Sequence, residues 1–366
     1  MKVALVHDYL NQAGGAEKVL KVLQAIFPEA PIFTLLYDEK KLGHIFPAQK
    51  VRSSFIQQLP FGRTKYKWFL LAMPAAIESF DLSGYDLVIS SASAFAKGVI
   101  TRPGTQHFCY CHTPTRYLWS DTHSYIEELS YSKLIKKFLP YFLTRLRLWD
   151  RLAADRPDHL IANSRTVQKR IKKYYNRESD LIQPPVETDK FKISGQLGNY
   201  YLIGGRLVPY KRYDLAVQAF NKLGIPLKIF GEGPELDKLK KMAKDNIEFL
   251  GKVDDEQLVE LYSRCLAFIH PQEEDFGITA VEAMASGRPV IAYGSGGALE
   301  TVIDGVTGKF FDEQTWEALA DAVIRFKPED YNPPAIREHA RKFDVEVFKR
   351  KIKDYIEEKT KQGRLL

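Results

Sequence analysis

The sequence is poor in cysteine, and this scarcity excludes a disulfide-stapled protein. Its 366 residues include three cysteines, Cys109, Cys111 and Cys265. An odd number without zinc-type spacing fits a reducing compartment such as the cytosol. Cys109 and Cys111 end an apolar run, so we expect buried structural thiols rather than a metal or redox site.

Long apolar segments are missing as well. No stretch of 18 apolar residues occurs in the chain, so we expect no transmembrane helix. The first residues, Met-Lys-Val-Ala-Leu-Val-His-Asp, are typical of a β-strand and not of a signal peptide, which has an apolar core of about 7–15 residues after a basic start. We therefore expect a cytoplasmic protein.

The charge is only moderately basic. The chain has 53 Lys and Arg against 46 Asp and Glu, a formal net charge of +7 at pH 7. This excess permits contact with an anionic surface but does not require nucleic acid, and no nucleic-acid-binding motif is present. With 45% hydrophobic and 27% charged residues, the composition is that of a globular protein and excludes a disordered or collagen-like chain.

The length suggests two domains. Short β-rich runs that are apolar on both faces alternate with helical patterns, which predicts doubly wound α/β layers with parallel strands. The expected strands are residues 2–7, 86–91, 106–111, 159–163, 200–204, 227–230, 248–250, 266–270 and 289–292, and the clearest helices are 16–26, 213–223, 234–244, 255–263 and 279–286. We place an N-terminal Rossmann-like domain at 1–183, a linker at 184–199, a C-terminal domain at 200–344 and a final helix at 345–362, which can pack on either domain.

Ligands of doubly wound sheets bind beyond the carboxyl ends of the strands, so the residues that follow each strand are the candidates for a site. The strongest signal is Glu-Asp-Phe-Gly-Ile-Thr-Ala-Val-Glu, in which Glu274 follows an expected strand and Glu282 lies early in the next helix. Gly277 allows a close backbone approach, and the N–H groups around Phe276–Ile278 can face hydroxyl or anionic oxygens. Because carboxylates accept hydrogen bonds from vicinal hydroxyls, the block favours a polyhydroxylated ligand. Two glutamates alone would indicate solvated residues that flank a helix.

A basic loop gives the second signal. It reads Gly-Gly-Arg-Leu-Val-Pro-Tyr-Lys-Arg from Gly204 and leads into the helix 213–223. A diphosphate would meet a helix dipole, loop amides and two cations there, Arg206 and Lys211. Arg212 is the weaker phosphate candidate, because one of two adjacent basic residues usually points to solvent. Alone, the motif would also fit an ordinary basic loop.

Two glycine pairs follow expected strands. Gly14-Gly15 permits a close backbone approach at the start of a helix, but it is not the GxGxxG fingerprint, so a dinucleotide site is poorly supported. Gly296-Gly297 could hold a distal phosphate through backbone N–H groups. Either pair could also form a plain turn.

His112 lies at the carboxyl end of the strand 106–111 and precedes the rigid Thr113-Pro114. We expect it to project into the cleft between the domains, although a satisfied core histidine fits equally well. The strand histidines without an assigned role are His7, His107, His159 and His270.

Together these motifs resemble the retaining family 4 glycosyltransferases, which have the GT-B fold of two Rossmann-like domains facing a central cleft. The Gly-Gly loop, His112, the Gly-Gly-Arg-x-x-x-x-Lys loop, the Glu-x7-Glu block and the later Gly-Gly occur in the family's order over nearly the whole chain. The stretch His112–Trp119, with Asp8-Tyr9, looks most like bacterial mannosyltransferases of polysaccharide and lipopolysaccharide O-antigen assembly. The resemblance implies transfer of a hexose, with GDP-mannose the favoured donor, to a glycan or polyprenyl-linked acceptor.

The resemblance also implies residue roles. Arg206 and Lys211 would bind the donor diphosphate, and Glu282 would hold the ribose. Glu274 would hold the transferred hexose, and His112 would contact that sugar near its reacting face. The implied donor-binding residues are Gly15, Arg206, Lys211, Phe276, Gly277, Ile278, Glu282 and Gly297, and the implied catalytic residues are His112 and Glu274. The helix 345–362 would cross back onto the N-terminal domain.

The expected mechanism follows from charge. Cleavage of the sugar C1–O bond loads negative charge onto the nucleoside diphosphate. No Asp-x-Asp metal motif stands at a strand end, so two cations and helix N-termini would stabilise that charge without a metal or another cofactor. No carboxylate is clearly placed as a nucleophile, and such enzymes are thought to retain configuration by front-face attack. We therefore expect Glu274 to position the sugar rather than to form a covalent intermediate.

Residues 133–151 suggest contact with a membrane. They carry six Lys or Arg, one Asp and several apolar residues, and residues 63–71 have a similar composition. A basic amphipathic helix can lie on anionic lipid, although Pro140 would break or kink it. A helix packed on the domain's own core fits almost as well. We favour peripheral membrane binding, because a lipid-linked acceptor requires it.

Several alternatives stay open. A UDP-sugar could replace GDP-mannose, because base contacts in such clefts often use backbone atoms. A nucleotide-sugar 2-epimerase shares the two-domain shape, but the block from Glu274 to Glu282 argues against it. A phosphorylase would need a pyridoxal-bearing lysine and usually a longer chain. A non-catalytic basic module for nucleic acid or membrane would not explain the ordered cleft motifs.

Overall fold

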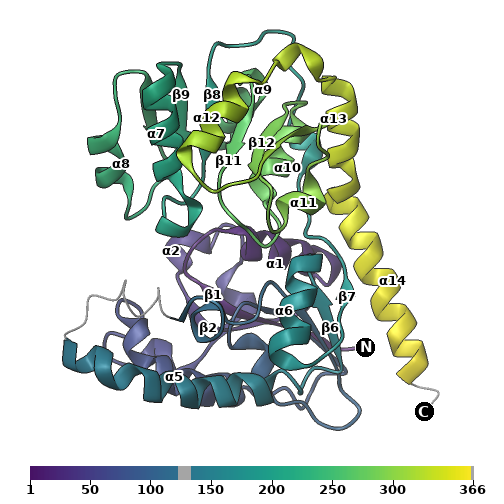
Figure 1. The fold of residues 1–366 in the computed structure, drawn as a ribbon. Coiled ribbons are helices and arrows are strands. Elements are labelled where there is room, and N and C mark those ends of the chain that lie inside the picture. Colours follow the sequence, from purple (N-terminus) through teal and green to yellow (C-terminus); the bar gives the residue numbers. More distant parts are fainter. Residues whose placement is uncertain (123–132, 364–366) are drawn as a thin grey trace. The chain divides into compact units, whose positions relative to one another are not determined.

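The computed structural model describes residues 1–122 and 133–363 and divides the chain into two compact units (Figure 1). The N-terminal unit comprises Met1–Gln183 together with the chain from Lys349 onward, and the C-terminal unit comprises Pro184–Phe348. Each unit has its own parallel sheet with flanking helices, so each has its own hydrophobic core.

The N-terminal unit contains a seven-stranded parallel sheet in the order β3-β2-β1-β4-β5-β6-β7. Its strands are β1 (Val3–Leu10), β2 (Ile32–Tyr37), β3 (Val51–Ser53), β4 (Leu87–Ala92), β5 (Gln106–Cys111), β6 (His159–Ala162) and β7 (Asp180–Leu181). The strand order reverses between β1 and β4, so the carboxyl ends of these two strands form the topological switch point of the sheet, where doubly wound domains bind ligands.

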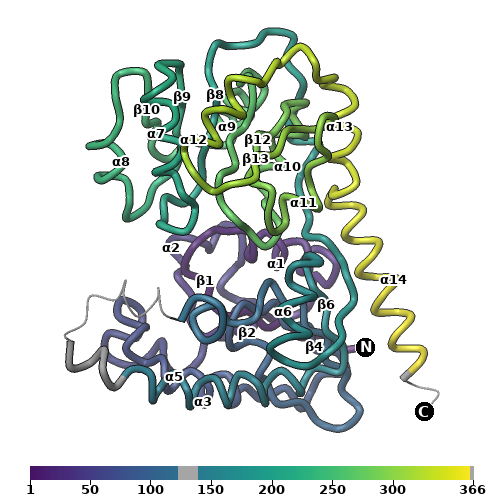
Figure 2. The backbone as a smooth tube through the Cα atoms, in the orientation of Figure 1, coloured from purple at the N-terminus to yellow at the C-terminus, as the bar shows by residue number. Residues whose placement is uncertain are grey.

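Helices flank this sheet. They are α1 (Gly15–Ile26), α2 (Glu39–Leu42), α3 (Met73–Glu78), α5 (Lys133–Ala153) and α6 (Arg165–Tyr175). The helices α3, α5 and α6 bury Ile77, Leu146 and Ile171 in one core with the strands. Helix α5 runs beside α3, where Trp149 Nε1 donates a hydrogen bond of 2.7 Å to Glu78 Oε1 (Figure 2).

Helix α5 continues through Pro140, so the predicted break does not occur there. The buried side chains of Leu143 and Leu146 anchor the helix on the unit's core just after the proline. Tertiary packing of this kind outweighs the local cost of one missing backbone hydrogen bond.

The C-terminal unit contains a six-stranded parallel sheet in the order β10-β9-β8-β11-β12-β13. Its strands are β8 (Tyr201–Gly204), β9 (Leu227–Phe230), β10 (Ile247–Gly251), β11 (Phe268–His270), β12 (Val290–Tyr293) and β13 (Gly308–Phe311). Its helices are α7 (Tyr213–Leu223), α8 (Leu236–Met242), α9 (Asp255–Arg264), α10 (Ile278–Ala285), α11 (Ala298–Thr301), α12 (Trp316–Ile324) and α13 (Pro333–Ala340). The switch point of this sheet lies between β8 and β11.

Both faces of the second sheet are covered. Leu202 of β8 packs in a core with α10 and α13, whereas its neighbours Tyr201 and Ile203 pack in a second core with α7 and α12. This alternation is what a central parallel strand between two helix layers requires. The predicted fold, with two doubly wound Rossmann-like domains, is therefore confirmed.

The stretch 184–199, which the sequence suggested was a linker, belongs to the C-terminal unit. Val186 and Phe191 are buried in that unit's core, and Val186 forms a β-bridge with Asp344. The stretch has no helical or strand periodicity, because isolated apolar residues in extended and 3₁₀ conformation anchor it.

The final helix, α14 (Val345–Gly363), groups with the N-terminal unit from Lys349 onward. The Tyr355 hydroxyl donates a hydrogen bond of 2.7 Å to Asp180 Oδ2, and its ring packs edge-on against Phe108. The apolar stripe of the helix explains this packing, because Ile352 and Ile356 are buried.

The three cysteines are buried, as predicted, and none of them forms a disulfide in the part of the chain that the structure describes. Burial raises the pKa of Cys109 to about 11 and that of Cys265 to about 12, so these thiols stay protonated at neutral pH and unreactive.

Candidate functional site

Two charged side chains meet at the switch point of the C-terminal sheet. Lys211 ends a short 3₁₀ turn between β8 and α7, and Glu274 lies in the loop after β11. Lys211 Nζ lies 2.9 Å from Glu274 Oε1, and their side chains are 12% and 16% exposed. The strands place these residues together because β8 and β11 are parallel neighbours and both loops leave the same edge.

The pair keeps both groups charged. Burial by itself would raise the pKa of Glu274, but the Lys211 ammonium holds that pKa below its ordinary value. Burial would likewise lower the pKa of Lys211, and the Glu274 carboxylate raises it instead. At neutral pH this edge of the sheet therefore presents a fixed cation and a fixed anion side by side.

Glycine makes room for the lysine. Gly205 has a positive φ of 125°, and a Cβ at this position would lie 3.3 Å from Lys211 Nζ and 3.4 Å from the Tyr213 hydroxyl. Gly231 lies against the same backbone, because a Cβ there would come within 1.8 Å of the Gly205 carbonyl oxygen. Neither position accepts a side chain without a shift of the loop. The Tyr213 hydroxyl is buried and has no hydrogen-bond partner in the part of the chain that the structure describes.

The other residues of the basic loop lie differently. Arg206 is exposed. Arg212 pairs with Asp214 through two contacts of 3.1 Å, which fits its weaker candidacy as a phosphate ligand.

Glu282 is buried beneath this edge rather than open to solvent. It lies on α10 with 4% of its surface exposed, and its Oε2 accepts a hydrogen bond of 3.2 Å from the Tyr262 hydroxyl. Burial, and after it the Glu282 carboxylate, raises the pKa of Tyr262, and Tyr213 contributes to the same rise. Of the four residues of the predicted pocket, Lys211 and Glu274 are in contact, Glu282 is buried and bonded to Tyr262, and Arg206 is exposed.

The glycine pair at 296 supports the Glu274 loop. The Gly297 N–H donates to the Glu274 carbonyl oxygen at 2.7 Å, and a Cβ at Gly297 would lie 2.4 Å from Phe276 Cα. We predicted that backbone N–H groups of the Gly296-Gly297 loop hold a phosphate. The Gly297 N–H is already used in this structure, and the role of the loop stays a prediction. Gly297 allows the close packing that positions Glu274.

The loop then turns into α10. Gly277 adopts a left-handed conformation, with φ 89°, just before the helix begins at Ile278. The first N–H groups of a helix have no acceptor within it, so this end carries partial positive charge. The Phe276 ring is buried edge-on against Phe343, so Phe276 offers its backbone rather than its side chain.

His270, to which the sequence analysis assigned no role, also lies near this site, at the carboxyl end of β11. Its Nδ1 lies 3.1 Å from Gln272 Nε2, whose amide can only donate there, and its Nε2 is buried without a partner among the described residues. Burial lowers the pKa of His270 to about 4, so the ring is neutral with its proton on Nε2. Its position at the end of a strand, directly before the loop that carries Glu274, could have indicated a place in the site.

In the N-terminal unit, His112 follows β5 and is 9% exposed. Its Nε2 lies 2.8 Å from Ser91 Oγ, and that oxygen lies 3.1 Å from His7 Nδ1. His7 Nε2 faces Glu17 Oε1 at 3.6 Å, and Glu17 Oε2 accepts the Gly14 N–H at 2.8 Å. The switch point of this sheet therefore contains a buried chain of polar side chains, His112, Ser91, His7 and Glu17, which includes a strand histidine to which we assigned no role.

Two family models match adjoining parts of the chain. "Glycosyltransferase Family 4" matches residues 31–190, and "Glycosyl transferases group 1" matches residues 187–343. The chain therefore carries two glycosyltransferase domains. They coincide closely with the two units, and the GT-B fold applies to the whole chain, as the next comparison shows.

A crystal structure of Anabaena Alr3699/HepE with UDP-glucose matches with a TM-score of 0.72 at 19% identity, covering 98% of this chain and 100% of that one. An uncharacterized glycosyltransferase of Methanocaldococcus jannaschii is 25% identical over 54% of this chain and 57% of its own. A GDP-mannose-dependent alpha-(1-6)-phosphatidylinositol monomannoside mannosyltransferase of Mycobacterium tuberculosis is 33% identical over 39% of this chain and 45% of its own. The matches thus span about half the length of these curated relatives.

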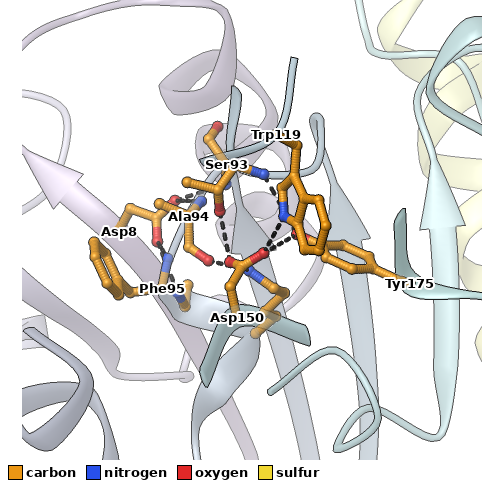
Figure 3. A network of polar contacts seen from close by, with 10 residues as sticks. Asp8, Ser93, Ala94, Phe95, Trp119, Asp150 and Tyr175 are labelled. Carbon is orange, nitrogen blue, oxygen red and sulfur yellow. Dashed lines mark hydrogen bonds and ion pairs between the residues drawn. The ribbon is translucent and has the colours of Figure 1, made fainter. Parts of the chain in front are cut away.

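Two buried carboxylates fix the loops of the N-terminal glycosyltransferase domain (Figure 3). Asp8 accepts the four consecutive N–H groups of residues 93–96 at 2.6 to 2.9 Å, which holds the loop after β4. Asp150 of α5 holds the loop after β5 through Thr115 and Trp119. The two loops directly follow the strands that carry Ser91 and precede His112. The two carboxylates therefore help to position the hydrogen-bonded side chains Ser91 and His112. These contacts could not be predicted from the sequence, because each carboxylate lies far along the chain from the loop that it holds.

No helix within residues 1–122 and 133–363 is long and apolar enough to cross a membrane. The same residues contain no group of three or more His, Cys, Asp or Glu side chains that could hold a metal ion.

Proposed function

We propose that the protein is a retaining hexosyltransferase that transfers mannose from GDP-mannose to a glycan or a polyprenyl-linked saccharide in bacterial polysaccharide assembly. The observation that carries this proposal is the contact between Lys211 Nζ and Glu274 Oε1 at the switch point of the C-terminal sheet. A nucleotide sugar has an anionic diphosphate on one side of its scissile bond and sugar hydroxyls on the other. A cation and a carboxylate side by side suit both halves.

Lys211 supplies charge where the reaction creates it. An ammonium has three N–H donors, and Glu274 takes one of them, which leaves two for diphosphate oxygens. As the sugar C1–O bond breaks, negative charge grows on the leaving diphosphate. A fixed donor at such a position typically contributes about 3 kcal/mol to the barrier. The N-terminus of α10 adds partial positive charge of the same sign.

We also propose that this reaction needs no metal, because these groups stabilise the leaving diphosphate by themselves. The test is the initial rate of transfer with EDTA, with Mg²⁺ and with Mn²⁺. We expect equal rates in the three conditions. A rate that depends on an added divalent cation would contradict the proposal.

The donor is tested by binding and by turnover. The mycobacterial relative is named as GDP-mannose-dependent, which favours GDP-mannose. In a thermal-shift comparison of GDP-mannose, UDP-glucose and ADP-glucose, we expect the first to stabilise the protein, by about 2.7 kcal/mol at a hundredfold excess over Kd. Stabilisation by UDP-glucose alone would replace mannose transfer with the UDP-sugar alternative.

Turnover then separates transfer from the other reactions. We expect release of GDP to depend on an added saccharide acceptor. Conversion of the nucleotide sugar without an acceptor would identify an epimerase instead, and binding without any turnover would identify a non-catalytic module.

We further propose that the protein is cytoplasmic and binds an anionic membrane surface through α5 and the segment 55–71. One face of α5 packs on the core through Leu143, Leu146 and Asp150, whereas Tyr141 and Leu148 are exposed. Part of the predicted basic stretch 133–151 precedes the described side chains, so the side-chain account begins at residue 139.

The segment 55–71 exposes apolar side chains as well. Trp68 and Phe61 are 60% and 62% exposed, and Lys65 Nζ lies 4.3 Å from the centre of the Trp68 ring. Aromatic rings beside cations are the residues that favour the interface of an anionic bilayer.

Vesicle flotation tests this surface. We expect the protein to float with vesicles that contain anionic lipid and not with neutral vesicles, and the double variant Phe61→Ala, Trp68→Ala to float less. The matched control is Ile324→Ala, which removes an equally exposed apolar side chain from the C-terminal unit. Equal flotation of both variants would remove this part of the proposal.

A further inference from the structure

The Tyr213 hydroxyl is a buried polar group to which the described residues offer no hydrogen bond. Tyr213 is 2% exposed, and its hydroxyl oxygen has no partner within residues 1–122 and 133–363. Tyr262 of the same unit is buried as well, but its hydroxyl donates to Glu282 Oε2 at 3.2 Å. A buried donor without an acceptor costs free energy, so the unused hydroxyl of Tyr213 points to a partner that is not part of the chain.

Tyr213 is the first residue of α7, and its position in the helix explains where the hydroxyl lies. Helix side chains lean toward the N-terminus of their helix, so the first one reaches back over the preceding loop. A Cβ at Gly205 of that loop would lie 3.4 Å from the Tyr213 hydroxyl and 3.3 Å from Lys211 Nζ. The hydroxyl and the ammonium therefore border the same side of a backbone position that carries no side chain.

These surroundings favour an anionic oxygen as the partner. Burial raises the pKa of Tyr213, so the hydroxyl keeps its proton at neutral pH and can donate it. Burial would lower the pKa of Lys211, but the Glu274 carboxylate raises it, so the neighbouring ammonium stays charged. The N-terminus of α7, a helix of 11 residues, adds partial positive charge. A phosphate oxygen accepts from an ammonium and a hydroxyl together, whereas a neutral sugar hydroxyl gains much less from the cation.

We propose that Tyr213 is a further binding residue for the donor diphosphate and that its hydroxyl donates to a phosphate oxygen beside Lys211 Nζ. The identity of this ligand rests on the proposed function, whereas the unused hydroxyl next to the ammonium does not. The hydroxyl is a neutral donor, so it adds a contact with phosphate without a second charge in the core. Because the leaving diphosphate gains negative charge, this hydrogen bond becomes stronger as the sugar C1–O bond breaks.

Calorimetric titration of GDP into the wild-type protein and Tyr213→Phe tests this contact. The substitution removes one oxygen and keeps the ring, which packs in the core with α7 and α12. We expect Tyr213→Phe to bind GDP about tenfold more weakly, the usual effect of a lost hydrogen bond to a charged group. Equal affinities would overturn the proposal and would mean that a buried water is enough to satisfy the hydroxyl.

Tyr200→Phe is the matched control for the titration. Its hydroxyl donates to the Leu261 carbonyl oxygen at 3.0 Å, and Tyr200 directly precedes β8, at the opposite end of that strand from the Lys211 loop. We expect Tyr200→Phe to bind GDP like the wild type. An equal loss of affinity in both variants would show an indirect effect on the fold and would overturn the contact with phosphate.

Unfolding in urea without a ligand separates binding from a structural role. Removal of a hydroxyl that has no partner in the protein should leave the midpoint of unfolding unchanged or raise it. Tyr200→Phe should lower the midpoint, because the Leu261 carbonyl oxygen loses this donor. A midpoint for Tyr213→Phe that falls as far as that of Tyr200→Phe would show that the hydroxyl is bonded inside the protein, and would overturn the proposal.

Failure of the proposed function would give a different result. GDP, UDP and ADP share the diphosphate, so we expect the tenfold loss in Tyr213→Phe with whichever of them binds the wild-type protein. Absence of binding of all three to the wild type would contradict the donor site itself, and with it this inference. Binding to the wild type that is unchanged in Tyr213→Phe would overturn the role of Tyr213 alone and leave the proposed function standing.

Discussion

The ion pairs Lys211–Glu274 and Lys97–Asp150 have the same chemistry and similar lengths, 2.9 and 2.6 Å, but different surroundings. Both side chains of the second pair are at most 2% exposed. Asp150 is also saturated, because its two oxygens accept hydrogen bonds from Lys97, Thr115, Trp119 and Tyr175 (Figure 3). The Lys211–Glu274 pair lies at the carboxyl ends of the central strands β8 and β11, and its side chains stay partly exposed to solvent.

The difference separates a structural pair from a binding pair. Every acceptor site of Asp150 that the fold can reach is used inside the protein, so a ligand has nothing to bind there. Lys211 donates to one carboxylate and keeps further donors. Charge alone therefore does not mark a site, whereas unused hydrogen-bonding capacity at a sheet edge does.

The largest effect is expected from breaking the buried pair. Asp150→Ala leaves Lys97 charged in a dry core and removes the anchor of the loop that follows β5, so we predict a loss of about 3–5 kcal/mol in the free energy of unfolding. Unfolding of the N-terminal unit in urea measures this loss. The control, Glu248→Ala, removes an exposed partner of Lys228 and should cost at most about 1 kcal/mol. Similar losses for both variants would mean that burial does not distinguish these pairs.

A smaller effect, on activity rather than on folding, is expected at the sheet edge. Glu274→Gln removes the charge beside the transferred sugar, and we predict a fall in kcat/KM of about tenfold to a hundredfold. Intact-mass measurement after incubation with donor should show no trapped hexose, because Glu274 positions the sugar. A mass increase of one hexose on the wild-type or variant protein would show a covalent intermediate and contradict this role.

The smallest effect is a dependence on pH. Burial raises the pKa of Glu274, and Lys211 more than offsets this, so its folded-state pKa is below the ordinary value. The stabilisation from this group is therefore present above the ordinary pKa and is lost as pH falls through the folded value. We predict that the stability difference between wild type and Glu274→Gln is constant near neutrality and shrinks as the pH falls below the ordinary pKa of a glutamate. A difference that widens in acid would show that the carboxylate is not stabilised in the folded protein.

The sequence predicted the sheets well where strands are apolar on both faces. The bounds of β5 and β9 are as predicted, and the ends of β8 and β11 lie where the charged loops were expected. The strand β2 was missed although its run Ile-Phe-Thr-Leu-Leu-Tyr is β-rich and fully buried. Short edge strands such as β3 and β7 leave too few residues for a pattern.

The candidate residues of the two units differ in how well the sequence predicted them. Lys211 and Glu274 belong to loops that follow neighbouring strands, so the strand order brings them together and spacing points to them. Ser91 and His7 lie near the ends of two neighbouring strands that are almost entirely buried, so an alternating pattern does not indicate which side chains are polar partners. A hydrogen-bonded chain across β1, β4 and β5 depends on side-chain rotamers, and these have no signature in the sequence.

The most direct test of the central claim is calorimetric titration of GDP-mannose into the wild-type protein, Lys211→Ala and Arg212→Ala. Arg212 is the matched control, because it is the adjacent basic residue and its guanidinium is already paired with Asp214. We predict that Lys211→Ala weakens binding about tenfold to a hundredfold, the contribution of a charge-assisted contact with phosphate, and that Arg212→Ala binds like the wild type. Equal affinities for Lys211→Ala and the wild type would contradict the assignment of this sheet edge as the donor site.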